Sequence, residues 1–169
     1  MKENFHDCLI MLLHHEGGFV NMKEDPGGMT NLGVTRAVYE TWLGREVSEK
    51  EMRDLQPEDV KDLYKNNYWD RCKCDDLPSG LDWAVFDWAV NSGTGRSAKA
   101  VQKVCGAEQD GAIGPKTLAL VEGQNTKYMI EEFGRIRQDF YESLKHFKTF
   151  GKGWTRRNKE TTEKALTMV

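Results

Sequence analysis

Residues 15–39 have the sequence HEGGFVNMKEDPGGMTNLGVTRAVY, and this stretch decides the fold of the first part of the chain. Before it, apolar side chains recur at helical spacing, and Gly17-Gly18 is expected to stop that helix. After the glycines, turn formers, Asn31 among them, alternate with short extended pieces. We therefore predict a helix over Phe5–His15, followed by a small hairpin or ribbon.

Helical patterns fill most of the remaining chain. Thr35 is expected to cap a helix over Arg36–Leu43, and Ser48-Glu49-Lys50-Glu51 is a capping-box pattern. Pro57 suits the first turn of a helix that continues to Asp70. The run Leu81–Asn91 is apolar around most of its surface, which indicates a buried central helix. Further helices are predicted over Ser97–Val104, Lys116–Val121, Tyr128–Phe147 and around Trp154–Leu166.

Length and charge narrow the class of protein. A chain of 169 residues suits one domain with a sizeable core. The net charge of −3 gives no global basic field, so no nucleic-acid partner is expected. The charge is uneven, because residues 46–62 are acid-rich and the tail over Lys145–Lys164 is basic. That tail suits an anionic polymer such as a bacterial cell wall, or it is simply a solvated helix face.

Targeting and metal-binding patterns are absent from the sequence. No apolar run approaches the ~20 residues of a membrane-spanning helix, so no membrane insertion is expected. The run Cys8–Leu13 is too short for a signal peptide and follows acidic residues, so we predict no cleaved signal.

The four cysteines are expected to be reduced and buried, since Cys72-Lys73-Cys74 lacks a second pair for zinc. We predict no metal and no cofactor.

The chemistry-bearing residues of the opening segment are Glu16, Asp25 and Thr30. Glu16 ends an apolar helix, where a carboxylate opposes the helix dipole and partial burial favours the protonated form of a general acid. Asp25 lies among glycines whose N–H groups can keep it ionised, so that it orients water or stabilises a developing cation. Thr30 would hold that water. Two such carboxyl groups are what glycosidic bond cleavage needs. Alternatively, Glu16 is a plain helix end and Asp25 a turn former.

The ordered motifs resemble glycoside hydrolase family 108, the phage and bacterial N-acetylmuramidases. The resemblance lies in EGGFVN (16–21), DPGGMT (25–30) and NLGVT (31–35). It continues in DWAVNSG (87–93) and DGAIGPKT (110–117), which look like the peptidoglycan-binding half of that family. It implies a mainly α, lysozyme-like, two-lobed fold with a small β-ribbon after the first helix. It also implies a single domain over 1–169, with a catalytic part at about 1–76 and a peptidoglycan-binding part at about 77–169.

A looser resemblance to phage-type lysozymes bears on the catalytic roles. Many of them carry Glu, eight residues, Asp, five residues, then Thr. Here eight residues separate Glu16 from Asp25, and only four separate Asp25 from Thr30. The partner of the glutamate therefore stays open, with Thr35 as the alternative hydroxyl. The analogy favours an inverting mechanism.

Substrate-binding candidates are Thr35, Tyr68, Trp69, Asp87 and Asn91. Asp87 and Asn91 lie one turn apart on the central helix, where they either line a binding surface or satisfy buried backbone groups. The aromatic rings would stack on sugars, although core packing is the alternative. For Thr35, the alternative role is a helix cap, which the sequence pattern favours over substrate binding. The turn at Asp110–Pro115 is expected to help in binding.

The family resemblance implies cleavage of the β-1,4 bond between N-acetylmuramic acid and N-acetylglucosamine in peptidoglycan. It covers phage endolysins and muramidases that assist toxin release. Two other functions are weighed: a lytic transglycosylase that needs Glu16 alone, and a non-enzymatic wall-binding module. We expect synthesis in the cytoplasm and action in the periplasm or on the wall after release. A holin or a dedicated export route would then carry the protein across the membrane.

Overall fold

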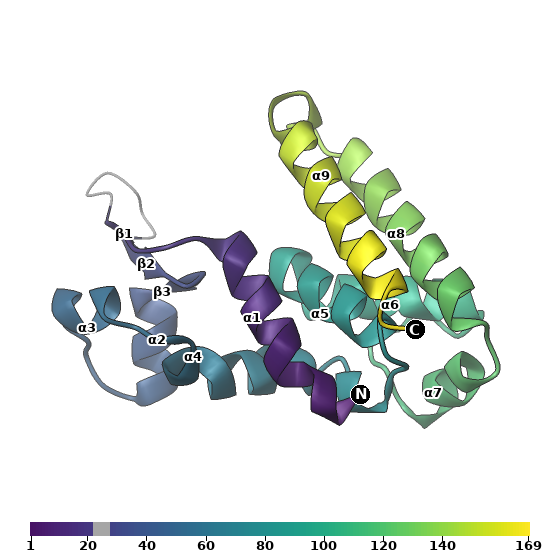
Figure 1. Cartoon of the computed structure of the whole chain (residues 1–169), viewed down its shortest axis with the longest axis horizontal. Coiled ribbons are helices and arrows are strands. Elements are labelled where there is room, and N and C mark those ends of the chain that lie inside the picture. Colours follow the sequence, from purple (N-terminus) through teal and green to yellow (C-terminus); the bar gives the residue numbers. More distant parts are fainter. Residues whose placement is uncertain (22–27) are drawn as a thin grey trace. The chain divides into compact units, whose positions relative to one another are not determined.

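The structure is a computed structural model that describes residues 1–21 and 28–169 (Figure 1). The chain forms two compact units. One comprises His6–Asn66, and the other comprises Met1–Phe5 with Asn67–Val169. The predicted division into a catalytic part and a peptidoglycan-binding part stays a prediction.

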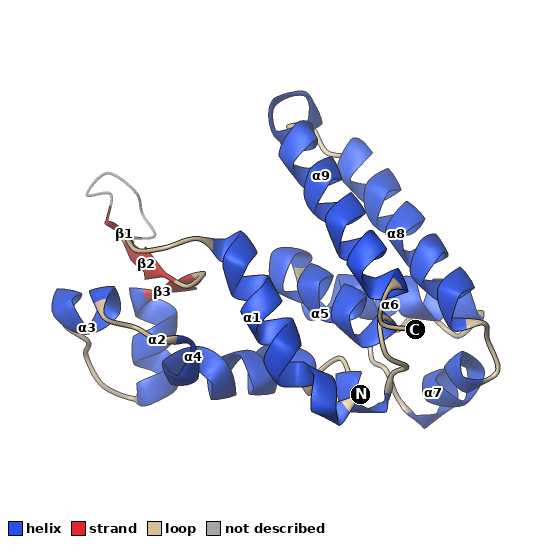
Figure 2. Cartoon of the chain, in the orientation of Figure 1, coloured by secondary structure: helices blue, strands red, loops and turns tan. Residues whose placement is uncertain are grey.

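The His6–Asn66 unit combines helices with a small sheet, coloured red in Figure 2. Its elements are α1 (Phe5–Glu16), β1 (Val20–Asn21), β2 (Met29–Asn31), β3 (Val34–Thr35), α2 (Arg36–Leu43), α3 (Glu49–Arg53) and α4 (Pro57–Tyr64). The strands form an antiparallel sheet in the order β1-β2-β3. The mainly α fold with a small ribbon after the first helix is therefore confirmed. Gly17, at φ +80°, follows the last residue of α1, as predicted.

Local capping signals set the helix starts in this unit. Thr35 is the N-cap of α2, and its hydroxyl accepts a hydrogen bond from the Val38 N–H at 3.2 Å. Ser48 and Glu51 form a reciprocal capping box at α3, and Pro57 occupies the first turn of α4. All three predictions are confirmed. The predicted helix to Asp70 ends instead as α4 at Tyr64, and a π-helical turn continues over Lys65–Trp69.

The second unit is helical throughout its regular structure. Besides short 3₁₀ turns at Lys2–Asn4 and Cys74–Asp76, it contains α5 (Leu81–Ser92), α6 (Thr94–Cys105), α7 (Pro115–Glu122), α8 (Thr126–Glu142) and α9 (Phe147–Leu166). Every residue of α5 from Leu81 to Ala89 is buried, so the central helix is confirmed. Helices α8 and α9 lie side by side (Figure 1). A Cβ on Gly134 would come within 2.6 Å of the Thr162 hydroxyl, so glycine permits their close approach.

Two predicted helix boundaries in this unit are wrong. The helix expected to reach Phe147 ends at Glu142, because the Ser143 hydroxyl donates to the Phe140 carbonyl at 2.6 Å and tight turns follow. Helix α6 begins at Thr94, before the predicted Ser97, since the single residue Gly93, at φ +100°, makes the whole break from α5.

The structure also shows the burial and pairing of the cysteines. All four cysteines are buried free thiols, as predicted. Burial raises the pKa of Cys72 to about 12, so this thiol is not a reactive thiolate. Among the described residues, no helix has the length and apolar character needed to cross a bilayer.

Candidate active site

Glu16 is the last residue of α1 and is half-buried. The turn between β2 and β3 lies directly on its side chain. A Cβ built on Gly33 would lie 2.9 Å from both Cβ and Cγ of Glu16, and 2.6 Å from the hydroxyl of Tyr64. Gly33 also has φ +74°, where L side chains are strained. Only glycine fits here, and the hairpin thereby fixes the stem of the predicted general acid.

Tyr64 holds the same turn from the other side. Its hydroxyl donates to the Leu32 carbonyl at 2.8 Å, and the residue is 1% exposed. Leu32 has φ +50°, an unusual conformation for leucine, and this hydrogen bond secures it. Tyr64 was not among the predicted site residues. The apolar face of α4 signals that it is buried, but no local pattern names a hydroxyl partner 32 residues away.

Thr30 and Thr35 are paired directly across β2 and β3. Opposite residues on an antiparallel pair have Cβ atoms about 4.5–5.5 Å apart, so the two side chains lie on one face of the sheet. Thr30 also pairs with Val20 of β1. Both threonines are half-buried. Thr35 is confirmed as a helix cap, while its role toward substrate, and that of Thr30, stay predictions.

Contacts from Asn31 of β2 and from Phe19, the residue before β1, anchor this part of the unit to α3. The Asn31 side-chain amide donates to the Met52 carbonyl at 2.8 Å and to the Arg53 carbonyl at 3.2 Å. The Arg53 guanidinium lies 4.3 Å from the centre of the Phe19 ring. Asn31 is therefore a buried strand residue, and its prediction as a turn residue is wrong, because its amide has backbone carbonyls to satisfy. Asp25 lies outside the described residues, so its role and the inverting mechanism stay predictions.

Asp87 lies inside the helical unit with an exposed fraction of 0%. Arg137 of α8 approaches its carboxylate at 2.7 Å, and Arg157 of α9 donates to it at 2.8 Å. The Thr161 hydroxyl adds a hydrogen bond at 3.2 Å. Burial by itself would raise the pKa of Asp87, but the two guanidinium groups outweigh burial and hold that pKa below its usual value. The carboxylate thus joins three helices.

Asn91 is connected to the same cluster through Tyr141. The Arg137 Nε–H donates to the Tyr141 hydroxyl at 3.0 Å, and this hydroxyl donates to Asn91 Oδ1 at 2.6 Å. Arginine can only donate, so the tyrosine proton must face an acceptor, which fixes Oδ1 of the amide at that position. Ser92 donates to the same oxygen at 2.7 Å. Asn91 is exposed, and no hydrogen bond involves its Nδ2 within the described residues.

Comparison with known proteins identifies the family. The family described as Glycosyl hydrolase 108 matches residues 9–93, about half of the chain. The chain belongs to glycosyl hydrolase family 108. The structure titled "Structure of Brucella abortus SagA" is 41% identical, covers 99% of this chain and 97% of its own, and superposes with a TM-score of 0.86. A search of curated proteins found no match.

Membership of family 108 makes the protein a glycoside hydrolase, of the class that acts on peptidoglycan. The match to the family spans Glu16, Thr30, Thr35, Asp87 and Asn91. It ends before the motif at 110–117. The mainly α, lysozyme-like fold predicted from the sequence agrees with this assignment.

Tyr68 and Trp69, predicted to contact sugar, lie in the π-helical turn of this family 108 enzyme. Trp69 is 0% exposed, and its indole N–H donates to Asp75 at 2.7 Å. Its ring packs edge-on against Phe5 and Phe86, with centroids 5.2 and 5.3 Å away. Tyr68 is half-buried. A sugar would reach Tyr68 more readily than Trp69, and both binding roles stay predictions.

The Asp110 motif folds onto α6. Asp110 accepts hydrogen bonds from the Ala112 N–H at 2.9 Å and from Gln102 at 2.7 Å, and these bonds lower its pKa. Gln102 is 1% exposed, and it also accepts from the Gly111 N–H at 2.9 Å. Gln102, which was not among the predicted site residues, thus closes this turn from within the core.

Proposed function

We propose that this family 108 enzyme is an N-acetylmuramidase that cleaves the β-1,4 bond between N-acetylmuramic acid and N-acetylglucosamine, with Glu16 as general acid. The observation that carries the proposal is the placement of Glu16. It is a half-buried carboxyl group at a helix end, and a glycine turn is packed on its stem. A catalytic carboxyl group has to be held within narrow limits, and this contact supplies the restraint.

The reaction assigns one task to each group. Glu16 transfers its proton to the oxygen between the sugars as the bond from that oxygen to the anomeric carbon breaks. In the inverting version, water attacks the anomeric carbon from the opposite face and gives its proton to Asp25. Thr30 would hold this water by its hydroxyl. Thr35 is the alternative, since the two threonines face each other across the sheet.

Substrate binding is the proposed task of the remaining predicted residues. Asn91 presents side-chain N–H groups that suit an acetamido or carboxylate oxygen of the glycan. Asp87 supports it from the core through Arg137 and Tyr141. Among the aromatic candidates, we propose Tyr68 for sugar contact because it is only half-buried, whereas Trp69 is fully buried.

The products of digestion test the proposal against the transglycosylase alternative. Purified peptidoglycan is digested, and the released muropeptides are analysed by mass spectrometry. A muramidase adds water and leaves a reducing N-acetylmuramic acid end. A lytic transglycosylase uses the sugar's own hydroxyl and leaves a 1,6-anhydro end, lighter by one water. Reducing muramic ends support the proposal, whereas anhydro ends or reducing glucosamine ends overturn it.

A further inference from the structure

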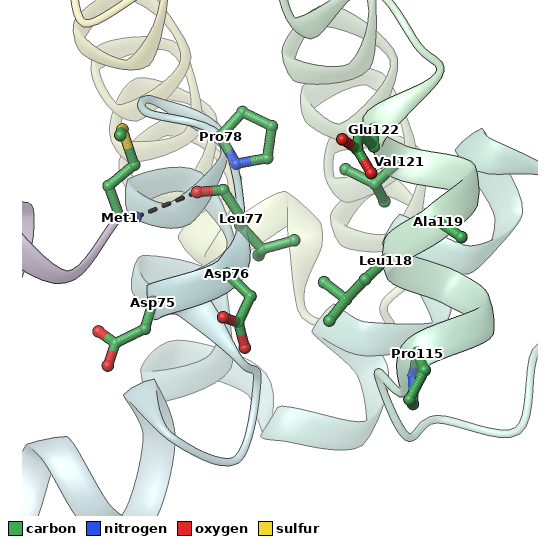
Figure 3. Close-up of a pocket in the computed structure, with 10 residues that line it drawn as sticks. All are labelled: Met1, Asp75, Asp76, Leu77, Pro78, Pro115, Leu118, Ala119, Val121 and Glu122. Atoms are coloured by element: carbon green, nitrogen blue, oxygen red, sulfur yellow. Dashed lines mark hydrogen bonds between the residues drawn. The ribbon is translucent and has the colours of Figure 1, made fainter.

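The helical unit contains a groove that neither the proposed chemistry nor the Asp87 cluster uses. It lies between the segment Asp75–Pro78 and helix α7, and its volume is about 580 Å³ (Figure 3). Leu77 and Leu118 point toward one another across it, and Pro78 and Val121 extend the apolar lining. The groove is open to solvent.

Both walls of the groove are fixed by contacts inside the unit. The Trp69 indole N–H holds Asp75 at 2.7 Å, and the N-terminal ammonium of Met1 donates to the Leu77 carbonyl at 3.1 Å. On the other wall, the buried hydroxyl of Thr117 in α7 accepts from Gln102 of α6 at 3.3 Å. The groove is therefore formed before any ligand arrives, which lowers the cost of binding.

The charged side chains at the rim of the groove are carboxylates. Asp76 from one wall and Glu122 from the other are exposed carboxylates at its rim (Figure 3). Among the described residues, no lysine or arginine forms an ion pair with either of them. The Met1 ammonium, which also lines the groove, is bonded to the carboxylate of Asp82 and to two carbonyl groups. An apolar lining with unpaired carboxylates at the rim suits an aliphatic chain that ends in a cation.

We propose that this groove binds a lysine-type diamino acid of the peptidoglycan peptide stem, whose side chain ends in an ammonium group alone. The methylene groups would lie on Leu77 and Leu118, and the terminal ammonium would lie between Asp76 and Glu122. This inference rests on the proposed function for its substrate class. Carboxylates or phosphates are disfavoured occupants, because the rim repels them. The groove would then recognise the peptide stem, a task separate from the bond cleavage proposed for Glu16.

The binding experiment uses the full-length parent chain, because the probe is a single sugar with its peptide and has no glycosidic bond that the enzyme could cleave. Muramyl tripeptide with a free lysine side chain is titrated and followed by amide chemical shifts, beside the same tripeptide with its lysine Nε acetylated. We expect the free amine to bind about 10-fold more tightly and to shift resonances of residues 75–78 and 115–122. Exposed ion pairs contribute about 0.2–1 kcal/mol each, so Asp76→Asn with Glu122→Gln should weaken binding several-fold. Glu131→Gln, at an exposed site on α8, is the matched control and should change nothing.

The outcomes separate this inference from the proposed function. Equal affinity for the two tripeptides, unchanged affinity of the double variant, or shifts confined to other residues would each overturn the groove proposal. If the parent enzyme yields reducing muramic ends but binds both tripeptides equally, the muramidase proposal stands and the groove proposal is wrong. If the parent enzyme binds the tripeptide with the free amine selectively but gives no muramidase products, only the muramidase proposal is wrong.

Discussion

Glu16 and Asp87 are both carboxylic acids on helices, and the structure treats them in opposite ways. Glu16 lies at the end of α1, half-exposed, with a hairpin turn packed on its methylene groups. Asp87 lies in the middle of a buried helix, where two arginines fix its charge. A carboxyl group that must exchange a proton needs access to substrate, whereas a carboxylate that joins helices needs permanent ionisation. The environment of Glu16 therefore suits a proton donor, and the environment of Asp87 suits a residue that stabilises the fold.

The largest expected effect is on activity at Glu16. Glu16→Gln keeps the shape of the side chain but removes the proton that the leaving oxygen needs, so wall clearance should fall by about 10²–10⁴-fold. The melting temperature should change little, because the residue is half-exposed. Turbidity of purified walls and thermal unfolding measure the two properties. Glu46→Gln, an exposed residue of the same unit, is the control. Near-normal clearance by Glu16→Gln would falsify the assignment of the acid.

Asp87 should show the opposite pattern, a loss of stability. Asp87→Asn leaves Arg137 without a charged partner in the core, and breaking a buried ion pair costs about 3–5 kcal/mol. Urea unfolding at pH 7 measures this loss. Removal of Glu132, which pairs with Arg135 on the surface of α8, as Glu132→Gln, should cost much less. Equal losses for the two variants would contradict the architectural role of Asp87.

The pH dependence of unfolding sharpens the same point. The pKa of Asp87 is lowered from its ordinary 3.8 in the folded chain. A carboxyl group with a depressed folded pKa stabilises the fold above its unfolded pKa, and this contribution is lost as the pH falls through the folded pKa. The difference in unfolding free energy between the parent and Asp87→Asn should therefore be full above about pH 5 and shrink below about pH 4. A difference that stays constant from pH 7 to pH 3 would show that the charge is not its cause.

Gly33→Ala tests how the acid is held. The new Cβ would overlap Glu16 and the Tyr64 hydroxyl, in addition to the strain of about 1–2 kcal/mol at a positive φ. Gly44 has a similar φ of +69° and nothing within 4 Å of a built Cβ, so Gly44→Ala carries the strain without the overlap. We expect Gly33→Ala to lose more stability and, in its folded fraction, to lower kcat. Equal behaviour of the two variants would show that the turn does not position Glu16.

Local chemistry explains which features the sequence predicted. Thr35, Ser48 and Pro57 act on the backbone within a few residues of their own positions. Their sequence patterns therefore predicted the starts of α2, α3 and α4. The end of α8 was missed because no glycine or proline marks it, and the turn depends on the Ser143 hydroxyl.

The partners of the candidate site were the part that sequence could not supply. Asn91 and Tyr141 are 50 residues apart, and Tyr64 and Leu32 are 32 apart. A helical pattern says that Tyr141 and Tyr64 face inward, but hydrogen-bond partners at such separations depend on how the helices pack. For Asp87, the sequence left lining a surface and satisfying buried groups as equal alternatives, and packing of α8 and α9 decides its contacts.

The smallest expected effect concerns the connection between the buried Asp87 cluster and Asn91, the residue of this region that we propose binds substrate. Tyr141→Phe removes the hydroxyl that fixes Asn91 Oδ1, and one hydrogen bond contributes about 0.5–1.5 kcal/mol. If Asn91 binds substrate, freeing its amide should weaken wall binding a few-fold, and Asn91→Ala should weaken it at least as much while kcat changes less. If Asn91 only satisfies its buried neighbours, both variants should lose melting temperature, yet their folded fractions should pull down walls normally. Thermal melting and wall pull-down, measured on both variants, distinguish these cases. Normal wall binding with a lowered melting temperature would show that Asn91, like Asp87, stabilises the fold and does not bind substrate.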